Sequence, residues 1–278
     1  LLPLRPSLCT TLRPNMQYNR RQSRSPLPPT ARSMTPRQRS RSGGRNRNWM
    51  PQPTAGLPGM CARGPEYLAM VDQVMIIQQE EPFEIATGIE TPNSYALHNA
   101  MGQLIYFCYE RSDEFGRQVV GANRPWTLHV VDNYQNEVMR ISRPHNPGAD
   151  YTGTHQCMVE CPPGNVVGWV RQRPGFTHGF CIQDPSGQVL FELTAADQSN
   201  HHFYVTSTFG GSIGEIRKMW GGVMKELHTD ADNFGVRFPM SLPVEQKATL
   251  LGATFLIDFV FFEDGADTAA PRGGVRLF

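Results

Sequence analysis

The sequence predicts a mainly β protein, a closed barrel of about twelve antiparallel strands around one hydrophobic C-terminal helix. Three observations predict it. Short apolar runs separated by turn residues recur about every ten residues from Tyr67 onward, a spacing typical of sandwiches and barrels. The 26 Gly and 23 Pro among 278 residues exceed average usage and indicate a turn-rich chain. Residues 248–262 then form one unbroken apolar segment of helix length.

The first 48 residues differ in composition from the rest. They hold eleven Arg and no Lys, Asp or Glu, which gives a net charge of +11. The rest of the chain has 15 basic and 25 acidic side chains, a net charge of −10. With one aromatic residue and seven Pro, residues 1–48 are too poor in apolar surface to offset their chain entropy. We expect a disordered Arg/Pro/Ser-rich arm.

Two short tracts suggest partners for this arm. Residues 39–42, Arg-Ser-Arg-Ser, are typical of tracts that bind anionic lipids or, nonspecifically, nucleic acid. Residues 26–29, Pro-Leu-Pro-Pro, suggest an SH3-type partner. The alternative is a solvated arm with no fixed partner. An Arg- and Ser-rich transit peptide is a third interpretation, but seven prolines disfavour the amphipathic helix it requires.

The domain plan continues with a Pro/Gly linker over residues 49–64, a barrel over residues 65–265 and a tail over residues 266–278. In the barrel, three segments read strand, Asx-opened turn, strand, as β-hairpins require. They are residues 96–107, 130–139 and 181–190. Further strands are expected at residues 74–78, 83–87, 156–161, 166–173, 203–207, 214–220 and 235–238.

A helix is expected over residues 243–263, with Pro243 and Glu245 in its first turn. Its apolar part, residues 248–262, would extend about 22 Å, short of the roughly 30 Å hydrocarbon core of a bilayer. Because it is apolar on every face, we expect it to fill the barrel. A short membrane anchor is the rival interpretation, and Asp258 in mid-segment would cost it about 2.5–3.5 kcal/mol.

Several motifs follow one another along residues 64–264. The most specific are residues 230–235 with Phe238-Pro239, and residues 255–259 with 261–263. Shorter ones are residues 64–68, 71–73, 99–103, 124–125, 132–133 and 162–164. In the order and spacing of these motifs, nearly all of residues 64–264 resembles the phospholipid scramblase family. The resemblance implies a tubby-like fold, a twelve-stranded barrel threaded by a C-terminal helix. It also implies calcium-dependent, ATP-independent movement of phospholipids between membrane leaflets.

Residues 230–241 are similar to the family's calcium segment and, in part, to an EF-hand loop. Asp230 and Asp232 take positions one and three, Gly235 position six, the Val236 carbonyl position seven and Ser241 position twelve. Since Ser replaces the usual closing carboxylate, we expect weak Ca²⁺ binding, with Kd on the order of 10⁻⁴–10⁻³ M, and tighter binding in Ser241→Asp. The alternative is an Asx-rich turn leading into a strand.

The positions of the six cysteines do not predict a palmitoyl lipid anchor. Family members often carry a palmitoylated Cys cluster after Arg143-Pro144, and residues 145–154 contain no Cys. Zinc at Cys157 and Cys161 with His155, or at His178 and Cys181, fits no standard ligand spacing. Buried thiols in a reducing compartment are therefore favoured. His201-His202 is interpreted as a turn or strand-edge pair. Residues 214–220 occupy the place of a nuclear import signal in some family members, but a solvated strand face is favoured.

The sequence therefore predicts a phospholipid scramblase that is not a bond-making enzyme, since it has no GxSxG, HExxH or phosphate-loop motif. The alternative is a non-catalytic lipid- or nucleic-acid-binding adaptor with the same barrel. The expected partner is a phospholipid membrane containing anionic lipids. The expected location is the cytoplasmic face of the plasma membrane, and the alternatives are mitochondrial or nuclear.

Overall fold

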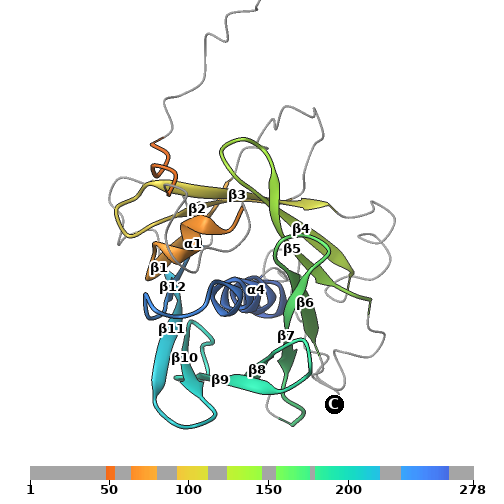
Figure 1. Cartoon of the computed structure of the whole chain (residues 1–278). Coiled ribbons are helices and arrows are strands. Elements are labelled where there is room, and N and C mark those ends of the chain that lie inside the picture. Colours follow the sequence, from red (N-terminus) through yellow and green to blue (C-terminus); the bar gives the residue numbers. More distant parts are fainter. Residues whose placement is uncertain are drawn as a thin grey trace, which may run out of the picture. The chain divides into compact units, whose positions relative to one another are not determined.

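Twelve antiparallel strands form a closed barrel in the computed structural model, which confirms the predicted architecture (Figure 1). Each strand pairs with the next along the chain, and β1 closes the ring against β12. The structure describes residues 48–53, 64–79, 93–111, 124–145, 155–175, 179–219 and 233–262. The elements are α1 (Glu66–Ala69), β1 (Gln73–Gln78), β2 (Ser94–His98), β3 (Leu104–Arg111), β4 (Trp126–Val131), β5 (Glu137–Arg143), β6 (Gln156–Glu160), β7 (Val166–Gln172), β8 (Gly179–Gln183), β9 (Val189–Ala195), β10 (His202–Ser207), β11 (Ser212–Met219), β12 (Asn233–Arg237) and α4 (Val244–Phe261).

The three hairpins expected from the sequence are β2–β3, β4–β5 and β8–β9. An Asx side chain holds each turn. In β4–β5, Asp132 Oδ1 accepts from the backbone N–H groups of Tyr134 and Asn136 at 2.8 and 2.9 Å. Asn99 and Asp184 do the same in the other two hairpins. The Asx residues at these turns therefore predicted the positions of the three hairpins correctly. The strand expected at residues 83–87 lies outside the described residues.

The helix α4 runs through the middle of the ring of strands (Figure 1). Every residue from Lys247 to Phe259 is buried, because the inward side chains of the strands pack against all faces of the helix. Glu245 lies in its first turn, as predicted, and Pro243 occupies the N-cap position one residue before the helix. The expectation of a helix inside the barrel is confirmed.

Two glycines allow the helix to lie close to the wall. A Cβ atom on Gly252 of α4 would lie 2.5 Å from Val159 Cγ2 of β6, and one on Gly168 of β7 would lie 2.9 Å from Thr249 Oγ1. Such distances are shorter than carbon atoms tolerate, so a side chain at either position would push the helix away from the wall.

Lys247, a fully buried lysine, fastens the N-terminal end of the helix. Its Nζ donates three hydrogen bonds of 2.8–2.9 Å to the carbonyls of Leu68, Val71 and Met240, and it lies over the Phe238 ring. All three ammonium donors are thus used. Burial lowers the pKa of this lysine, and the nearby carboxylate of Asp72 opposes that shift. The ammonium joins α1, the loop to β1 and the turn before α4.

A second, smaller apolar cluster lies on the outer face of the barrel. Ala96, Leu104, Phe107 and Val131 form it, and the Trp49 ring packs edge-on against Phe107 with centroids 5.6 Å apart. The backbone there makes a parallel bridge, in which Leu104 N–H donates to Asn48 O and Met50 N–H to Leu104 O, both at 2.8 Å. The first described residues of the Pro/Gly segment are therefore paired with β3.

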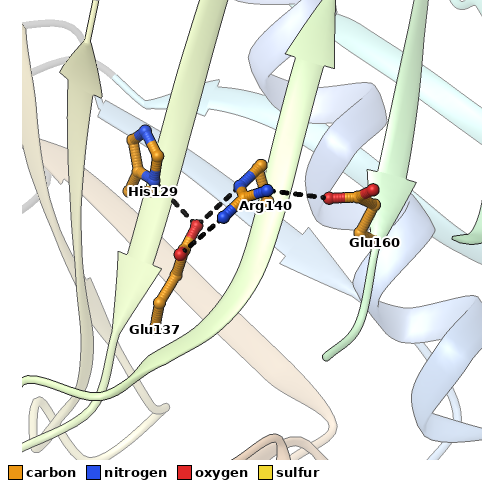
Figure 2. A network of polar contacts seen from close by, with 4 residues as sticks. All are labelled: His129, Glu137, Arg140 and Glu160. Atoms are coloured by element: carbon orange, nitrogen blue, oxygen red, sulfur yellow. Dashed lines mark hydrogen bonds and ion pairs between the residues drawn. The ribbon is translucent and has the colours of Figure 1, made fainter. Parts of the chain in front are cut away.

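A row of polar side chains crosses the outer face of β4, β5 and β6 (Figure 2). Arg140 donates to both carboxylate oxygens of Glu137 at 2.8 Å, and its third nitrogen lies 3.5 Å from Glu160. His129 Nδ1 lies 2.7 Å from Glu137, and its ring stacks on Tyr109 of β3. Four adjacent strands are thus linked by side chains as well as by the backbone ladder.

Replacing Lys247 by Met tests the buried lysine. Met has a similar length but no donor, so three carbonyls would lose their partner. We expect the free energy of unfolding, measured by urea denaturation, to fall by roughly 3 kcal/mol or more. In the control, Arg171→Met on the exposed face of β7, the change should be within about 1 kcal/mol. Equal stability of the two variants would contradict the role given to Lys247.

Acid titration tests the Glu137 network. Burial by itself would raise the pKa of Glu137, but the hydrogen bonds from Arg140 and His129 outweigh it, so the pKa lies below its ordinary value of 4.5. A lowered carboxylate pKa adds stability that is complete above pH 4.5 and is lost as the pH falls through the folded-state value.

We therefore expect Glu137→Gln to be less stable than the parent at neutral pH and to lose less stability between neutral pH and pH 3. Urea unfolding across that range is the measurement, with Glu192→Gln on exposed β9 as the control. Parallel stability curves for the parent and Glu137→Gln would rule out the contribution.

Candidate functional site

The structure describes residues 233–241 of the expected calcium segment, residues 230–241, but not its first three residues. Asp230 and Asp232, the two expected carboxylate ligands, lie outside the described residues. Gly235 and Val236 lie within β12, and Ser241 is exposed in the turn that precedes α4. No group of three or more His, Cys, Asp or Glu side chains arranged for a metal ion occurs among the described residues.

The backbone of β12 differs from that of an EF-hand loop. Gly235 pairs with Met75 on one side and with Arg217 on the other, and it is not among the described glycines with positive φ. In an EF-hand the glycine at position six makes a sharp turn. Val236 is likewise paired on both sides, with Val74 and Ile216, so its carbonyl lies within the sheet. The middle of the expected loop, residues 233–237, is therefore a strand.

The length of β12 separates the expected ligands. Asp232 is bonded to Asn233 at the start of β12, whereas Ser241 follows Arg237 at its end. At about 3.3 Å per residue, the α-carbons of Asn233 and Arg237 are about 13 Å apart. Oxygens that share one Ca²⁺ must each lie about 2.3–2.6 Å from the ion. Ser241 therefore follows the end of β12 that is far from Asn233, in the turn that leads to α4.

Three of the four described cysteines are buried thiols. Cys108, Cys157, Cys161 and Cys181 are all free, and the first three are buried. Cys157 Sγ donates to Gly252 O and Cys161 Sγ to Val138 O, both at 3.6 Å. Burial raises the pKa of the Cys157 thiol to about 12, so it stays protonated and unreactive at neutral pH. His178, the other histidine considered, lies outside the described residues.

The His201-His202 pair is divided between two different environments. His201, before β10, stacks on Phe262 at the C-terminal end of α4. His202 begins β10, and its Nε2 lies 3.0 Å from Glu215 of β11. Burial by itself would raise the pKa of Glu215, but hydrogen bonds from Arg217 and His202 reverse this effect and lower it.

A charged cluster around Glu215 is the feature that the sequence interpretation missed. Arg217 was read as part of a solvated strand face, yet its Nε donates to Glu215 at 2.9 Å and Arg237 Nη1 lies 3.6 Å from the same carboxylate. Period-two alternation along β11 already places Glu215 and Arg217 on one face. Only the pairing of β11 with β12 and of β12 with β1 adds Arg237 and Gln73.

The rival interpretation of the C-terminal helix was a short membrane anchor. Among the described residues, no helix has both the length and the hydropathy of a membrane span. In the structure α4 is enclosed by the barrel strands.

Comparison with known proteins places this geometry in a family. The Scramblase family model matches residues 50–264, which include all twelve strands and α4. Phospholipid scramblase 1 of Mus musculus is 38% identical over 235 residues, covering 77% of this chain and 68% of its own length. Phospholipid scramblase 2 of Bos taurus is 38% identical over 241 residues, covering 77% and 76%.

A third relative, phospholipid scramblase family member 5 of Homo sapiens, is 35% identical over 231 residues, covering 78% of this chain and 85% of its own. Among solved structures, a protein from Arabidopsis thaliana aligns with a TM-score of 0.41 and 10% identity, over 70% of this chain and 96% of the other. The expectation that the chain is not a bond-making enzyme agrees with the family match. With a family model covering its whole barrel and relatives at 35–38% identity, the chain belongs to the phospholipid scramblase family.

Proposed function

We propose that this protein moves phospholipids in both directions between membrane leaflets, dependent on calcium and independent of ATP. The observation that carries the proposal is the family match over residues 50–264, because it spans the entire barrel and its helix. Relatives named phospholipid scramblase support the lipid substrate. The proposed place of action is the cytoplasmic face of the plasma membrane, and the proposed partners are bilayers with anionic lipids.

The filled barrel limits how such a protein can act. The side chains that line the lumen pack on α4, and residues Leu250, Leu251, Ala253 and Leu256 are completely buried. A charged headgroup would lose its hydration in such an interior at a cost of many kcal/mol. As long as α4 occupies the lumen, the route for headgroups therefore lies outside it. This supports a mechanism in which the outer wall of the barrel contacts and perturbs the bilayer.

For calcium, we propose that Asp230 and Asp232 are the charged ligands. Two carboxylates on neighbouring residues bring hard oxygen donors together, as Ca²⁺ requires. The expected contributions of the Val236 carbonyl and of Ser241 gain no support from β12, because the strand holds Val236 in the sheet and Ser241 follows the end of the strand that is far from Asn233. We therefore propose weak binding by an incomplete ligand set, completed by water.

A non-catalytic adaptor is the second candidate, and the filled lumen is the observation that favours it. The barrel could present its outer wall to lipids while the Arg-rich arm, residues 1–48, binds anionic surfaces. SH3-type domains and nucleic acid remain proposed partners of this arm.

Reconstitution in liposomes separates the two candidates. Vesicles are prepared with a fluorescent phospholipid on both leaflets, and a membrane-impermeant quencher reports the fraction that reaches the outer leaflet. In millimolar Ca²⁺ and without ATP, we expect the quenched fraction to rise above the fraction of label that starts in the outer leaflet. In chelator, the quenched fraction should stay equal to that starting fraction. An adaptor would bind the vesicles without moving the lipid, so unchanged quenching with bound protein would reject the proposed scrambling.

Substitutions at both ends of β12 test the calcium proposal. We expect Asp230→Ala with Asp232→Ala to abolish the Ca²⁺ response in titration calorimetry. Ser241→Asp, in contrast, should leave the Ca²⁺ affinity within twofold of the parent, because the extended strand β12 lies between Ser241 and the two aspartates in the chain. Tighter Ca²⁺ binding by Ser241→Asp would instead support a twelve-residue, EF-hand-like loop in which residue 241 is a ligand. An unchanged response in the double variant would exclude both aspartates as ligands.

A further inference from the structure

A hollow in the outer wall of the barrel lies between β1, β11 and β12. It has a volume of about 160 Å³ and is lined by Gln73, Glu215, Arg217, Met219, Gly235 and Arg237. The register explains how these residues meet. Glu215 pairs with Arg237, and Arg237 pairs with Gln73, while Arg217 pairs with Gly235 in the next outward-facing row. Three strands therefore build the hollow from residues as far apart in sequence as 73 and 237.

Gly235 keeps the hollow open. It lies in the middle of β12, where a side chain would otherwise stand on the outer face between Arg217 and Met75. A Cβ atom there would lie 3.2 Å from Met219 Sδ. Glycine weakens a strand interior and often marks a place where a ligand approaches the backbone. Here the missing side chain leaves space in the hollow beside Met219.

The hollow carries more positive than negative charge. Glu215 is its single carboxylate, and it holds Arg217 through Nε at 2.9 Å and Arg237 through Nη1 at 3.6 Å. Gln73 Oε1 accepts from Arg237 Nε at 3.2 Å. Each guanidinium has five N–H donors, so most of these ten donors are not used by Glu215 and Gln73. The two arginine side chains are 56% and 64% exposed and therefore accessible to a ligand from solution.

We propose that this hollow binds a phosphate group between Arg217 and Arg237. Glu215 and Gln73 hold the two guanidinium groups in place, and a phosphate offers several acceptor oxygens to their planar forks. The ligand is a phosphate ester or inorganic phosphate, and a phospholipid headgroup is one source of it. The lipid source rests on the proposed function, whereas the anion site itself does not.

Apolar side chains around the hollow favour the lipid source. Tyr204, paired with Glu215 on β10, is 49% exposed, and Phe209 at the tip of the β10–β11 hairpin is 92% exposed. Met240, in the turn that follows β12, is 51% exposed. Two aromatic rings and a methionine on the strand and turns next to an anion site are the combination that a membrane interface accommodates, with headgroup phosphate next to acyl chain.

A second hollow continues the first one toward these apolar side chains. It has a volume of about 360 Å³, shares Gln73 and Arg237 with the first, and is lined further by Asp72, Ile213, Gly214 and Phe238. Gly214 is needed there, because a Cβ atom would lie 1.9 Å from the Arg237 carbonyl oxygen. The adjoining space is available to the remainder of a headgroup.

The site is tested by NMR on the full chain, with inorganic phosphate as the probe. The backbone amides of β12 are followed, because their signals are distinct from those of the Arg-rich arm, which also attracts phosphate. We expect saturable shifts of the β12 amides in the millimolar range. The double variant Arg217→Gln with Arg237→Gln should bind phosphate at least tenfold more weakly. The control Arg171→Gln, which removes an arginine from β7 elsewhere on the wall, should bind phosphate as the parent does.

Gly235→Ala provides a second variant that keeps both arginines and reduces the space in the hollow, and it should also weaken phosphate binding. A thermal melt of each variant shows that it is folded. Absence of β12 shifts in the parent, or equal shifts in the parent and the double Arg variant, would overturn the site.

Vesicles distinguish the source of the phosphate. Sedimentation with vesicles of phosphatidylcholine alone, and with added phosphatidic acid, is compared for the parent, the double Arg variant and Arg171→Gln. A specific loss of phosphatidic acid binding in the double variant assigns the site to a lipid headgroup. Unchanged vesicle binding with lost phosphate shifts assigns it to soluble phosphate. A parent that binds phosphate at β12 but does not scramble lipid rejects the proposed function and retains the site.

Discussion

Burial of α4 inside the barrel is the constraint on which the rest of the structure depends. Because the helix is apolar on every face, it needs apolar partners in every direction, and only a closed ring of strands supplies them. The ring in turn needs the helix, since a twelve-stranded barrel encloses more space than its own side chains fill. Gly168 and Gly252 set how closely helix and wall approach, and Lys247 ties the entrance of the helix to α1.

This arrangement moves the functional chemistry to the outer wall. The inside of the barrel is committed to packing, as the buried thiols of Cys157 and Cys161 show by donating to backbone carbonyls. The outside carries the Glu137 network, the Trp49 contact on β3 and the Arg-lined hollow at β12. Under the proposed function, the outer wall is then the surface that meets lipid.

The sequence predicted the fold well because the fold depends on local patterns. Asx-opened turns such as Asp132–Asn136 and Asp184–Gln188 identified the hairpins, and the uninterrupted apolar run identified the helix. The calcium segment was harder, since the residue types of an EF-hand do not fix a loop backbone, and Gly235 and Val236 belong to a strand. The hollow could not be found, because Gln73 and Arg237 meet only through the closure of the barrel. Four-residue α1 is too short for any periodicity.

The position of α4 is tested most directly by hydrogen exchange of its backbone amides, followed by mass spectrometry on the full chain without vesicles. A helix enclosed by twelve strands exchanges only when the whole barrel unfolds. If α4 is buried in the barrel, peptides covering residues 248–259 exchange at the rate set by the global free energy of unfolding, and adding vesicles does not alter that rate. Rapid exchange of these peptides in solution, with protection that develops only on vesicles, would contradict burial of α4 in the barrel and make it a membrane element.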